Sequence, residues 1–527
     1  MKKKNKSRLI LIIFFLFAVI LPLFNLFTYV RRDDIKILIF TDGFSELMFN
    51  SLSTTILATF ISVSLALFVS GVLRRSQIKF KNMFNVVLTV PMLIPSISHA
   101  IGLIILFGHN GIITQFLDLH FNLFGFVGIV MGSILYSFPV AFLLISDALS
   151  YEDYTSYEAC EILGIPKVKQ FLNITLPNIG KPLLAACFAV FTMIFTDYGV
   201  PLMIGGKFQT LSAYMYREII GLLNFSNGAI IGVVLLIPAF IAFIVDLKIE
   251  KERHDSTLVR KFVVKENKKR DLLANIILIL ISVIFLLPIF AFVLLSVVEQ
   301  FPKNMSLSLR HFKDALQLDI VDYLINSLTI ALSTALLGTV VSYLTAYITA
   351  RSNKTPTVLF LHLLSMFSLA IPGVVLGLSY VLFFNSTFIY NTIFILILVN
   401  IVHFFSSPYL MAYNSLSGYG SSFNDLAEVH GISKWRMLVD VFIPNTQLTI
   451  FEMFSFFFTN SMITISAVSF LSNVRNQPLA LLIPQLDAQS LIEATALVSL
   501  LILICNIIFK SGMYFFKQHK LKGENNE

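Results

Sequence analysis

Long runs of apolar residues, each separated from the next by a short polar loop, recur along the whole chain. Each run approaches or exceeds the roughly 20 residues that an α-helix needs to cross about 30 Å of hydrocarbon. They occupy residues 9–30, 47–73, 84–107, 122–148, 182–205, 227–248, 272–297, 323–350, 356–384, 389–414, 447–472 and 489–513. The pattern predicts an all-α integral membrane protein with about twelve transmembrane helices.

The composition supports a bilayer environment. Of 527 residues, 57% are hydrophobic and only 13% are charged, whereas soluble domains have about 25% charged residues. The net charge of +8 comes from basic residues in short loops, which is typical of topology signals and argues against nucleic-acid binding. The three cysteines have no paired spacing that would indicate a disulfide framework or a metal site.

The positions of Lys and Arg predict the orientation of the chain in the cell membrane. Basic residues gather at both termini and in alternate loops, whereas the loops at 108–121 and 385–388 contain none. The apolar run after the basic N-terminus is too long for a secretory signal and lacks a cleavage site. We therefore expect a multi-pass protein with both termini in the cytoplasm.

The chain divides into two similar halves. Residues 248–270, with nine basic and four acidic residues, form a polar interruption without apolar periodicity. The predicted domains are a first six-helix repeat at 1–248, a cytoplasmic basic linker at 249–271, a second six-helix repeat at 272–516 and a cytoplasmic tail at 517–527. An even number of spans in each half gives both repeats the same orientation, and therefore a parallel repeat.

Shared positions within the apolar runs strengthen the repeat. The second predicted helix opens with Asn50-Ser51-Leu52-Ser53 in one half and with Asn326-Ser327-Leu328-Thr329 in the other. Both halves have a proline inside the third predicted helix and another inside the fourth, at Pro95, Pro139, Pro372 and Pro408. Two similar bundles are expected to enclose a pathway.

A polar loop that occurs once in each half is the most informative motif. Its first copy consists of Glu158, Ala159, Cys160 and Gly164, then nine residues, then Ile174, Leu176 and Pro177. Its second copy has the same spacing at Asp425, Ala427, Gly431, Val441, Ile443 and Pro444. A short amphipathic helix ended by glycine fits both copies. An ordinary interfacial helix would explain one copy, but two matching copies indicate two docking points for a soluble partner.

At these residues the chain resembles the membrane subunits of ABC importers, whose pattern is Glu-Ala-Ala, three residues, Gly, nine residues and Ile-x-Leu-Pro. The first copy departs from it only by Cys160, and the second by Asp425, Leu426, Val441 and Ile443. The resemblance covers nearly the whole chain and implies a fused pair of type I importer permease domains. It implies that both loops are coupling helices that fit into clefts of a cytoplasmic ATPase.

The resemblance also implies the partners. Two copies of a separate ABC ATPase would bind ATP and Mg²⁺, and this chain would hold no cofactor. An extracytoplasmic solute-binding protein would dock on the outer loops at 31–46, 206–226, 298–322 and 473–488. The looser second copy predicts that the two ATPase contacts are unequal.

The fusion of two permeases resembles importers for ferric iron, thiamine and 2-aminoethylphosphonate. The segment from Phe195 to Pro201, followed by Gly205-Gly206, is similar to the fifth helix of this group. The segment from Asn460 to Leu471 is most similar to 2-aminoethylphosphonate permeases. That phosphonate is the first expected substrate, with ferric iron or thiamine as the alternative.

Several polar residues fall within apolar runs. Asp197 either lines the pathway or serves as a hydrogen-bonded packing or gate residue, since an acid within a span normally faces protein or water. In the other half, Asn460, Ser461, Thr464 and Ser466 suggest a weakly polar translocation surface, and packing between helices explains them almost as well. His99, His362 and His403 share no spacing that suggests a metal cage.

Two other classes of protein compete with this interpretation. An ion-coupled secondary transporter also has two six-helix halves, but it needs no duplicated cytoplasmic loop and should have more ionisable residues in mid-membrane. A membrane enzyme is disfavoured because no catalytic constellation recurs. The sequence also lacks the Gly-x-x-x-x-Gly-Lys-Ser/Thr motif, so the chain is not expected to hydrolyse ATP.

Overall fold

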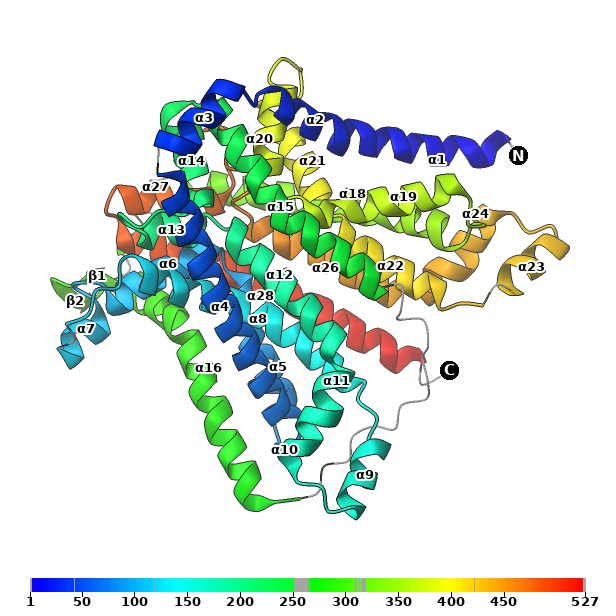
Figure 1. The fold of residues 1–527 in the computed structure, drawn as a ribbon, viewed down its shortest axis with the longest axis horizontal. Helices are drawn as coiled ribbons and strands as arrows, with labels where there is room; N and C mark the ends of the chain where they lie inside the picture. Colours follow the sequence, from blue (N-terminus) through cyan, green and yellow to red (C-terminus); the bar gives the residue numbers. More distant parts are fainter. Residues whose placement is uncertain are drawn as a thin grey trace. The chain divides into compact units, whose positions relative to one another are not determined.

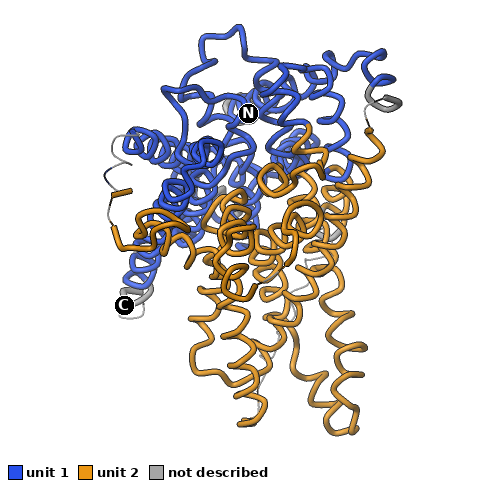
Figure 2. The backbone as a smooth tube through the Cα atoms, turned by 90° about the vertical axis from the view of Figure 1, so that its left-hand side faces the viewer, with its two compact units in different colours: residues 1–38, 215–239, 312–527 blue, residues 39–214, 240–311 orange. Residues whose placement is uncertain are grey.

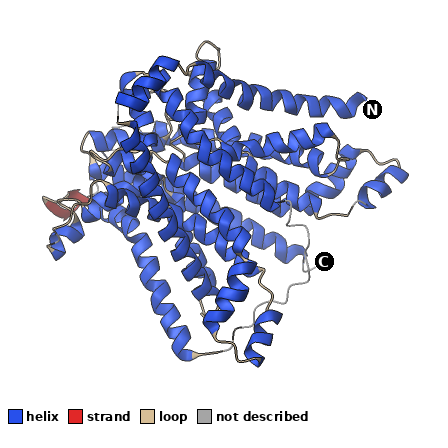
Figure 3. Cartoon of the chain, in the orientation of Figure 1, coloured by secondary structure: helices blue, strands red, loops and turns tan. Residues whose placement is uncertain are grey.

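The computed structural model is helical apart from one short hairpin in the described part of the chain (Figures 1 and 3). It describes residues 2–524, except 42, 119, 251–263, 265, 309, 312, 314–318 and 421. Most of the expected linker at 249–271 and the last residues of the expected tail therefore lie outside the described residues.

The chain forms two compact units, coloured separately in Figure 2. Unit 1 comprises residues 1–38, 215–239 and 312–527, and unit 2 comprises residues 39–214 and 240–311. Three helices have residues in both, namely α3 (Arg32–Thr41), α14 (Leu211–Leu222) and α15 (Phe225–Glu250).

Unit 2 contains most of the first half of the sequence. Its elements are α4 (Phe44–Arg74), α5 (Lys81–Thr89), η2 (Val90–Leu93), α6 (Ser96–Phe107), α7 (Ile112–Leu117), α8 (Phe126–Ser150), α9 (Thr155–Ile162), α10 (Lys167–Gln170), η3 (Phe171–Thr175), α11 (Leu176–Asn178), α12 (Gly180–Thr196), α13 (Gly199–Ile204), α16 (Lys268–Ser296), β1 (Val298–Gln300) and β2 (Asn304–Leu307). The strands pair antiparallel, with Val298 opposite Leu307.

Unit 1 contains most of the second half. Its elements are α1 (Lys2–Phe15), η1 (Leu16–Ile20), α2 (Leu21–Thr28), α18 (Ile320–Ala350), α19 (Pro356–Met366), η4 (Phe367–Ala370), α20 (Gly373–Phe384), α21 (Ile393–His403), α22 (Ser406–Ser417), α23 (Ser422–Val429), α24 (Lys434–Arg436), η5 (Met437–Phe442), α25 (Ile443–Asn445), α26 (Gln447–Ile463), η6 (Leu479–Leu481), α27 (Leu482–Ala488) and α28 (Ile492–Glu524).

The first helix of each sequence half belongs to the unit formed mainly by the other half. In unit 1, the Tyr380 hydroxyl donates to the carbonyl oxygen of Ala18 at 2.7 Å, and the Asn25 amide donates to that of Leu382 at 2.8 Å. In unit 2, α16 approaches α6 so closely that a Cβ built on Gly102 would lie 2.5 Å from Pro288 Cβ. Contacts between residues hundreds of positions apart therefore define the compact units.

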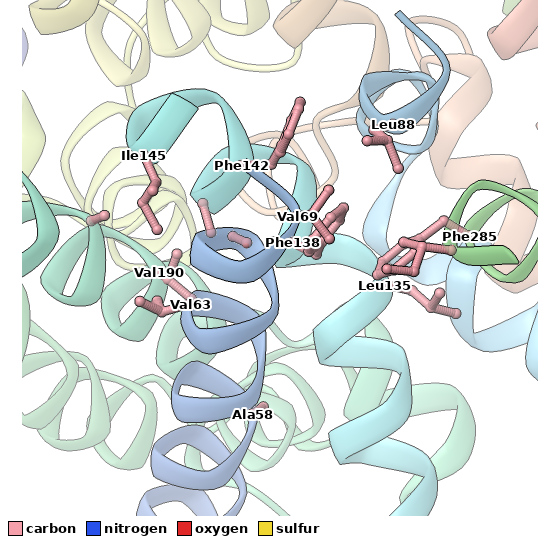
Figure 4. Close-up of a cluster of buried hydrophobic side chains, with 14 of the residues drawn as sticks. Ala58, Val63, Val69, Leu88, Leu135, Phe138, Phe142, Ile145, Val190 and Phe285 are labelled. Atoms are coloured by element: carbon pink, nitrogen blue, oxygen red, sulfur yellow. The ribbon is translucent and has the colours of Figure 1, made fainter. Parts of the chain in front are cut away.

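The hydrophobic core of unit 2 joins α4, α8, α12 and α16. Phe138 and Phe285 stack with their ring centroids 4.1 Å apart, and Val63, Val69 and Val190 are buried in the same cluster (Figure 4). In unit 1, a smaller cluster includes Phe458, whose ring stacks on that of Phe509 with the ring centroids 3.7 Å apart. Aromatic burial stabilises both units.

The described residues contain eight helices that are long and apolar enough to cross a membrane, or up to eleven if each of three bent helix pairs counts as one span. The bent pairs comprise residues 167–196, 356–384 and 393–417. The predicted span at 447–472 corresponds to the 17-residue helix α26, which is still within the range of lengths that can span a bilayer. The all-α membrane fold is confirmed.

Two expected helices are interrupted at proline. In the third span of each half, a 3₁₀ turn ends before Pro95 or Pro372, and a new helix begins immediately after that proline. The preceding residues, Ile94 and Ile371, have extended backbones, because the proline ring disfavours helical geometry in the residue before it. The predicted continuity through these prolines is wrong, whereas Pro139 does lie inside α8.

The fifth span of each half is also interrupted, at equivalent positions. Helix α12 ends at Thr196, and Asp197 is extended, with φ −72° and ψ 126°. Helix α26 ends at Ile463, and Thr464 has φ −68° and ψ 134°. The expected helices through residue 205 and through residue 472 are therefore shorter than predicted.

After each of these breaks, the chain is hydrogen-bonded to an Asn-Ser pair at the start of the second helix of the same half. Leu211 N–H donates to Ser51 Oγ at 2.8 Å, and Asn50 donates to the carbonyl oxygen of Gln209 at 3.2 Å. In the second half, Leu479 N–H donates to Ser327 Oγ at 2.6 Å, and Asn326 donates to the carbonyl oxygen of Gln477 at 3.3 Å. The shared Asn-Ser motif thus makes the same contact in both halves.

Candidate functional site

The two copies of the polar loop have the same local architecture. Each begins with an eight-residue helix, α9 or α23, and continues through a glycine to a short helix, α10 or α24. A π-helical stretch follows, η3 or η5, and then a three-residue helix, α11 or α25. In Figure 1, α9 extends beyond the ends of α5 and α8 in its unit, and α23 beyond those of α18 and α22 in its own.

A left-handed glycine ends each eight-residue helix. Gly164 has φ +67° and Gly431 has φ +64°, a conformation that L side chains adopt only with strain. The chain turns back so that Ile165 N–H donates to the carbonyl oxygen of Cys160 at 2.9 Å, and Ile432 N–H to that of Ala427 at 2.8 Å. These bonds satisfy carbonyl groups that a helix end leaves without intrahelical partners.

The loop prolines lie at the same place in the architecture of both copies. Pro177 and Pro444 are each at the second position of a three-residue helix, just before α12 or α26. Each proline follows closely on the π-helical stretch, whose hydrogen bonds span five residues instead of four and so depart from the regular α-helical pattern. The sequence pattern therefore has a direct structural counterpart in both copies.

Large apolar side chains are exposed on each loop. At one matching position Ile162 is 86% exposed and Val429 84%, and at another Val168 is 70% exposed and Trp435 68%. Such residues are normally buried against a partner when they cluster. Both loops thus present an apolar surface next to their terminating glycine.

The other candidate coupling residues differ in burial. Ala159, Pro177 and Pro444 are exposed, Ala427 is buried, and the remaining ones are intermediate, namely Glu158, Cys160, Ile174, Leu176, Val441 and Ile443. Asp425 belongs to α23, but its side chain lies outside the described residues. The motif therefore contributes both to the exposed surface and to the attachment of the loop.

Arg75 attaches the first loop to its unit. This residue follows the last residue of α4, and its Nη2 lies 2.6 Å from Thr175 Oγ1, 3.3 Å from the Tyr157 hydroxyl and 3.4 Å from a Glu152 carboxylate oxygen. Tyr157 in turn donates to Glu152 at 2.8 Å. The network joins the beginning of the loop, its helix and its exit to the end of α4.

Burial shapes the electrostatics of this network. The side chain of Glu152 is only 4% exposed, so its charge depends on Arg75 for compensation. Burial raises the pKa of Tyr157 to about 12, with a further contribution from the hydrogen bond to Glu152, although the Thr175 hydroxyl acts in the opposite direction. The phenol therefore remains protonated and able to donate at neutral pH.

Arg351 attaches the second loop by different chemistry. It follows α18 as Arg75 follows α4, and its two terminal nitrogens donate to the carbonyl oxygens of Tyr419 at 2.6 Å and Gly420 at 3.0 Å. Its guanidinium also lies over the Phe442 ring, 4.9 Å from the centroid. Phe442 occupies the position that corresponds to Thr175 in the first copy.

From the sequence, Arg75 and Arg351 are interpreted only as two of the basic loop residues that indicate the orientation of the chain in the membrane. A comparison of the halves could have found them, because Arg75 follows Asn50 by as many residues as Arg351 follows Asn326. Their hydrogen-bond partners were not predictable, since Arg75 bonds to side chains and Arg351 bonds to backbone carbonyls, although each guanidinium also lies over an aromatic ring.

Asp197 connects two interrupted spans within unit 2. One carboxylate oxygen accepts a hydrogen bond from Ser96 Oγ at 2.6 Å, and the other accepts one from Val200 N–H at 3.0 Å. Its carbonyl oxygen accepts a bond from Ser212 Oγ at 2.7 Å. These contacts join the start of α6 to the junction between α12 and α13.

The candidate pathway residues of the other half cluster at the end of α26. Asn460 donates to the carbonyl oxygen of Phe456 at 2.8 Å, and Thr464 N–H donates to that of Asn460 at 3.0 Å. Ser461 and Thr464 are buried, and Ser466 is half-buried. Among the described residues, no group of three or more His, Cys, Asp or Glu side chains could hold a metal ion.

The sequence matches a known family twice. The profile of the binding-protein-dependent transport system inner membrane component matches residues 58–251 and 338–522, which together make up more than half of the chain. The chain belongs to this family. The predicted fusion of two ABC importer permease domains is thereby confirmed, and each matched region includes one copy of the polar loop.

Curated relatives of this permease family include ferric transport proteins. The chain is 26% identical to the ferric transport system permease protein FbpB of Actinobacillus pleuropneumoniae over 66% of its length, and 24% identical to the putative ferric transport system permease protein FbpB 1 of Haemophilus influenzae over 79%. The aligned regions span about half (52%) of the first relative and 68% of the second. The molybdenum transport system permease protein ModB of Haemophilus influenzae is 30% identical over 32% of the chain and 77% of its own length.

Proposed function

We propose that this permease couples ATP hydrolysis on a separate subunit to solute import through its two polar loops. The observation that carries the proposal is the repeated architecture of these loops, each with a left-handed glycine, exposed apolar residues and an arginine attachment. Two such surfaces match the two ATPase copies expected of an ABC importer. ATP and Mg²⁺ would bind the ATPase, and this chain would supply no catalytic residue.

The mechanism we infer is alternating access. Closure of the ATPase dimer would draw the two loops together, close the cytoplasmic side and open the outer side to a loaded binding protein. Each loop would transmit this movement through its arginine to the second helix of its half and through its proline segment to the fifth. Both termini would lie in the cytoplasm, as the charge bias predicts.

Substitution of the exposed loop residues tests the proposal. Ile162→Asp and Val429→Asp place a charge where an apolar contact is expected, so each should reduce co-purification of the ATPase. Phe116→Asp is a matched control, because Phe116 is also 86% exposed but lies on α7, in a loop predicted to be extracytoplasmic. Unchanged ATPase binding by the Ile162→Asp, Val429→Asp double variant would contradict the proposal.

Ferric iron is the substrate that we propose. Two relatives that align over most of the chain are ferric transport permeases, whereas the expectation of 2-aminoethylphosphonate rests only on the similarity of residues 460–471. Phosphonate and thiamine remain the alternatives. Thermal shift of the partner binding protein with ferric ion, 2-aminoethylphosphonate and thiamine discriminates among them, because a bound ligand stabilises the folded state.

An energy-source experiment separates this proposal from ion-coupled transport. Uptake should stop when ATP is depleted and continue when the ion gradient is collapsed with an ionophore. The opposite result would favour a secondary transporter.

A further inference from the structure

Unit 2 contains a cavity of about 510 Å³ beside the attachment of the first loop. One wall is a single face of α4, formed at helical spacing by Ser64, Leu67, Phe68, Gly71, Val72 and Arg75. Leu149 and Phe171 add further apolar surface, and Arg270 at the start of α16 adds a second guanidinium. The cavity is thus mostly apolar along its length and basic at one end.

The dimensions of this cavity fit one leaflet of a bilayer. From Ser64 to Arg75, the helix rises about 16 Å at about 1.5 Å per residue. Half of a hydrocarbon core of about 30 Å is nearly the same length. Both α4 and α16 are candidate membrane spans, and both have their basic end at the cavity. The basic end therefore lies where a lipid headgroup would lie.

Two basic segments, far apart in the sequence, meet at this end. Residues 74–81 and 266–271 together contain seven Lys or Arg and two acidic residues. Gln77 joins them, because its N–H donates to an Asp271 carboxylate oxygen at 3.0 Å. Its side-chain amide also donates at 2.7 Å to the carbonyl oxygen of Val264, two residues before the second segment.

Two carboxylates at this end are paired with arginine. Arg75 pairs with Glu152 at 3.4 Å, and Arg270 pairs with Asp271 at 2.7 Å. The seven basic residues of the two segments outnumber Glu152, Glu266 and Asp271, so the region has an excess of positive charge that attracts anionic lipid.

We propose that this cavity binds an anionic glycerophospholipid, with an acyl chain along the α4 face and its phosphate at the end formed by Arg75 and Arg270. The observations that favour a lipid over a free anion are the apolar lining and its leaflet-long extent. Phe171 and Thr175 belong to the exit of the first loop, so the bound lipid contacts the segment that leads from the loop to α12. The leaflet is the cytoplasmic one, according to the charge bias.

Gly71 allows a direct test. A Cβ built on Gly71 meets nothing within 4 Å, so Gly71→Leu should fill the cavity without a clash and should also favour the helix. Gly512→Leu is the matched control, since a Cβ on this helical glycine also meets nothing within 4 Å and Gly512 does not line the cavity. Arg270→Gln removes one charge and keeps an unfilled cavity.

The measurement is lipid retention by the purified full-length chain in native mass spectrometry, with phosphatidylglycerol and phosphatidylcholine added in equal amounts. The wild type and Gly512→Leu should retain phosphatidylglycerol preferentially. Gly71→Leu should lose that preference, and Arg270→Gln should bind phosphatidylglycerol about fivefold more weakly, as expected for one basic residue near an anionic headgroup.

Two outcomes would overturn the proposal. The first is an undiminished preference for phosphatidylglycerol in both Gly71→Leu and Arg270→Gln. The second comes from melting temperatures of the purified chain, measured with inorganic phosphate or with phosphatidylglycerol. It is that inorganic phosphate raises the melting temperature of the wild type as much as phosphatidylglycerol does, and raises that of Gly71→Leu equally. In that case the basic end binds a free anion, and the apolar cavity has no part in recognition.

Discussion

Arg75 donates a hydrogen bond to Thr175 across 2.6 Å and thereby ties the exit of the first loop to the end of α4. The same guanidinium pairs with Glu152 at the beginning of the loop. Because one residue holds both ends of the segment, its loss should free the whole loop rather than a single contact. The two ends of a coupling element would then no longer move with α4.

Arg75→Ala should therefore reduce uptake more than it reduces the amount of protein in the membrane. Removal of a hydrogen-bond partner from the buried Glu152 and Thr175 should destabilise the loop by about 2 kcal/mol. Solute-stimulated ATP hydrolysis in proteoliposomes measures the coupling, and co-purification of the ATPase measures the docking. Lys79→Ala, at an exposed position nearby, is the control. Wild-type coupling in Arg75→Ala would show that the network is dispensable.

The second loop should respond differently to a conservative change. Arg351 uses two nitrogens to reach two carbonyl oxygens, a fork geometry that a lysine ammonium on a flexible stem does not reproduce. We expect Arg351→Lys to lose most of the coupling that Arg351→Ala loses. Arg75→Lys should retain more, since a lysine can still pair with Glu152. Uptake assays of the four variants at equal expression compare the two attachments, and equal rescue by lysine would contradict the difference.

The two loop glycines give a third prediction. Gly164 and Gly431 have positive φ, and nothing lies within 4 Å of a Cβ at either position, so the penalty of a substitution comes from the backbone alone. Gly164→Val and Gly431→Val should each cost about 1 to 2 kcal/mol in the left-handed conformation and displace the adjacent apolar residues. Asparagine tolerates this conformation better and is the control. Normal uptake by the double valine variant would count heavily against coupling through these loops.

Much of this arrangement follows from local sequence. The glycine and proline of each loop have conformations that their own chemistry favours, so their roles could be predicted residue by residue. The helix breaks at Asp197 and Thr464 could not, because apolar composition indicates a span without indicating where the backbone becomes extended. Nor could the pairing of Tyr380 with Ala18, since the contact depends on how helices from opposite ends of the chain pack.

The pKa of Tyr157 predicts a pH dependence. Its folded-state pKa of about 12 exceeds the ordinary value of about 10 for tyrosine, so folding is favoured while the phenol is protonated. This contribution is complete below about pH 10 and is lost as the pH rises towards 12. Melting temperatures between pH 9 and pH 12 should therefore fall more steeply for the wild type than for Tyr157→Phe. Parallel curves would show that Tyr157 does not titrate with unfolding.

The Ser51 and Ser327 hydroxyls provide a matched pair within one chain. Each accepts the N–H of a leucine, Leu211 or Leu479, and both serines are almost fully buried. Replacement by alanine leaves a buried N–H without its acceptor, which should cost about 1 to 3 kcal/mol. Because the geometry is repeated, Ser51→Ala and Ser327→Ala should lower the melting temperature by similar amounts. Ser53→Ala is the control, since the Ser53 hydroxyl donates only to the carbonyl oxygen of Asn50 within the same helix. A large effect at one serine and none at the other would mean that the repeated contact stabilises only one half of the permease.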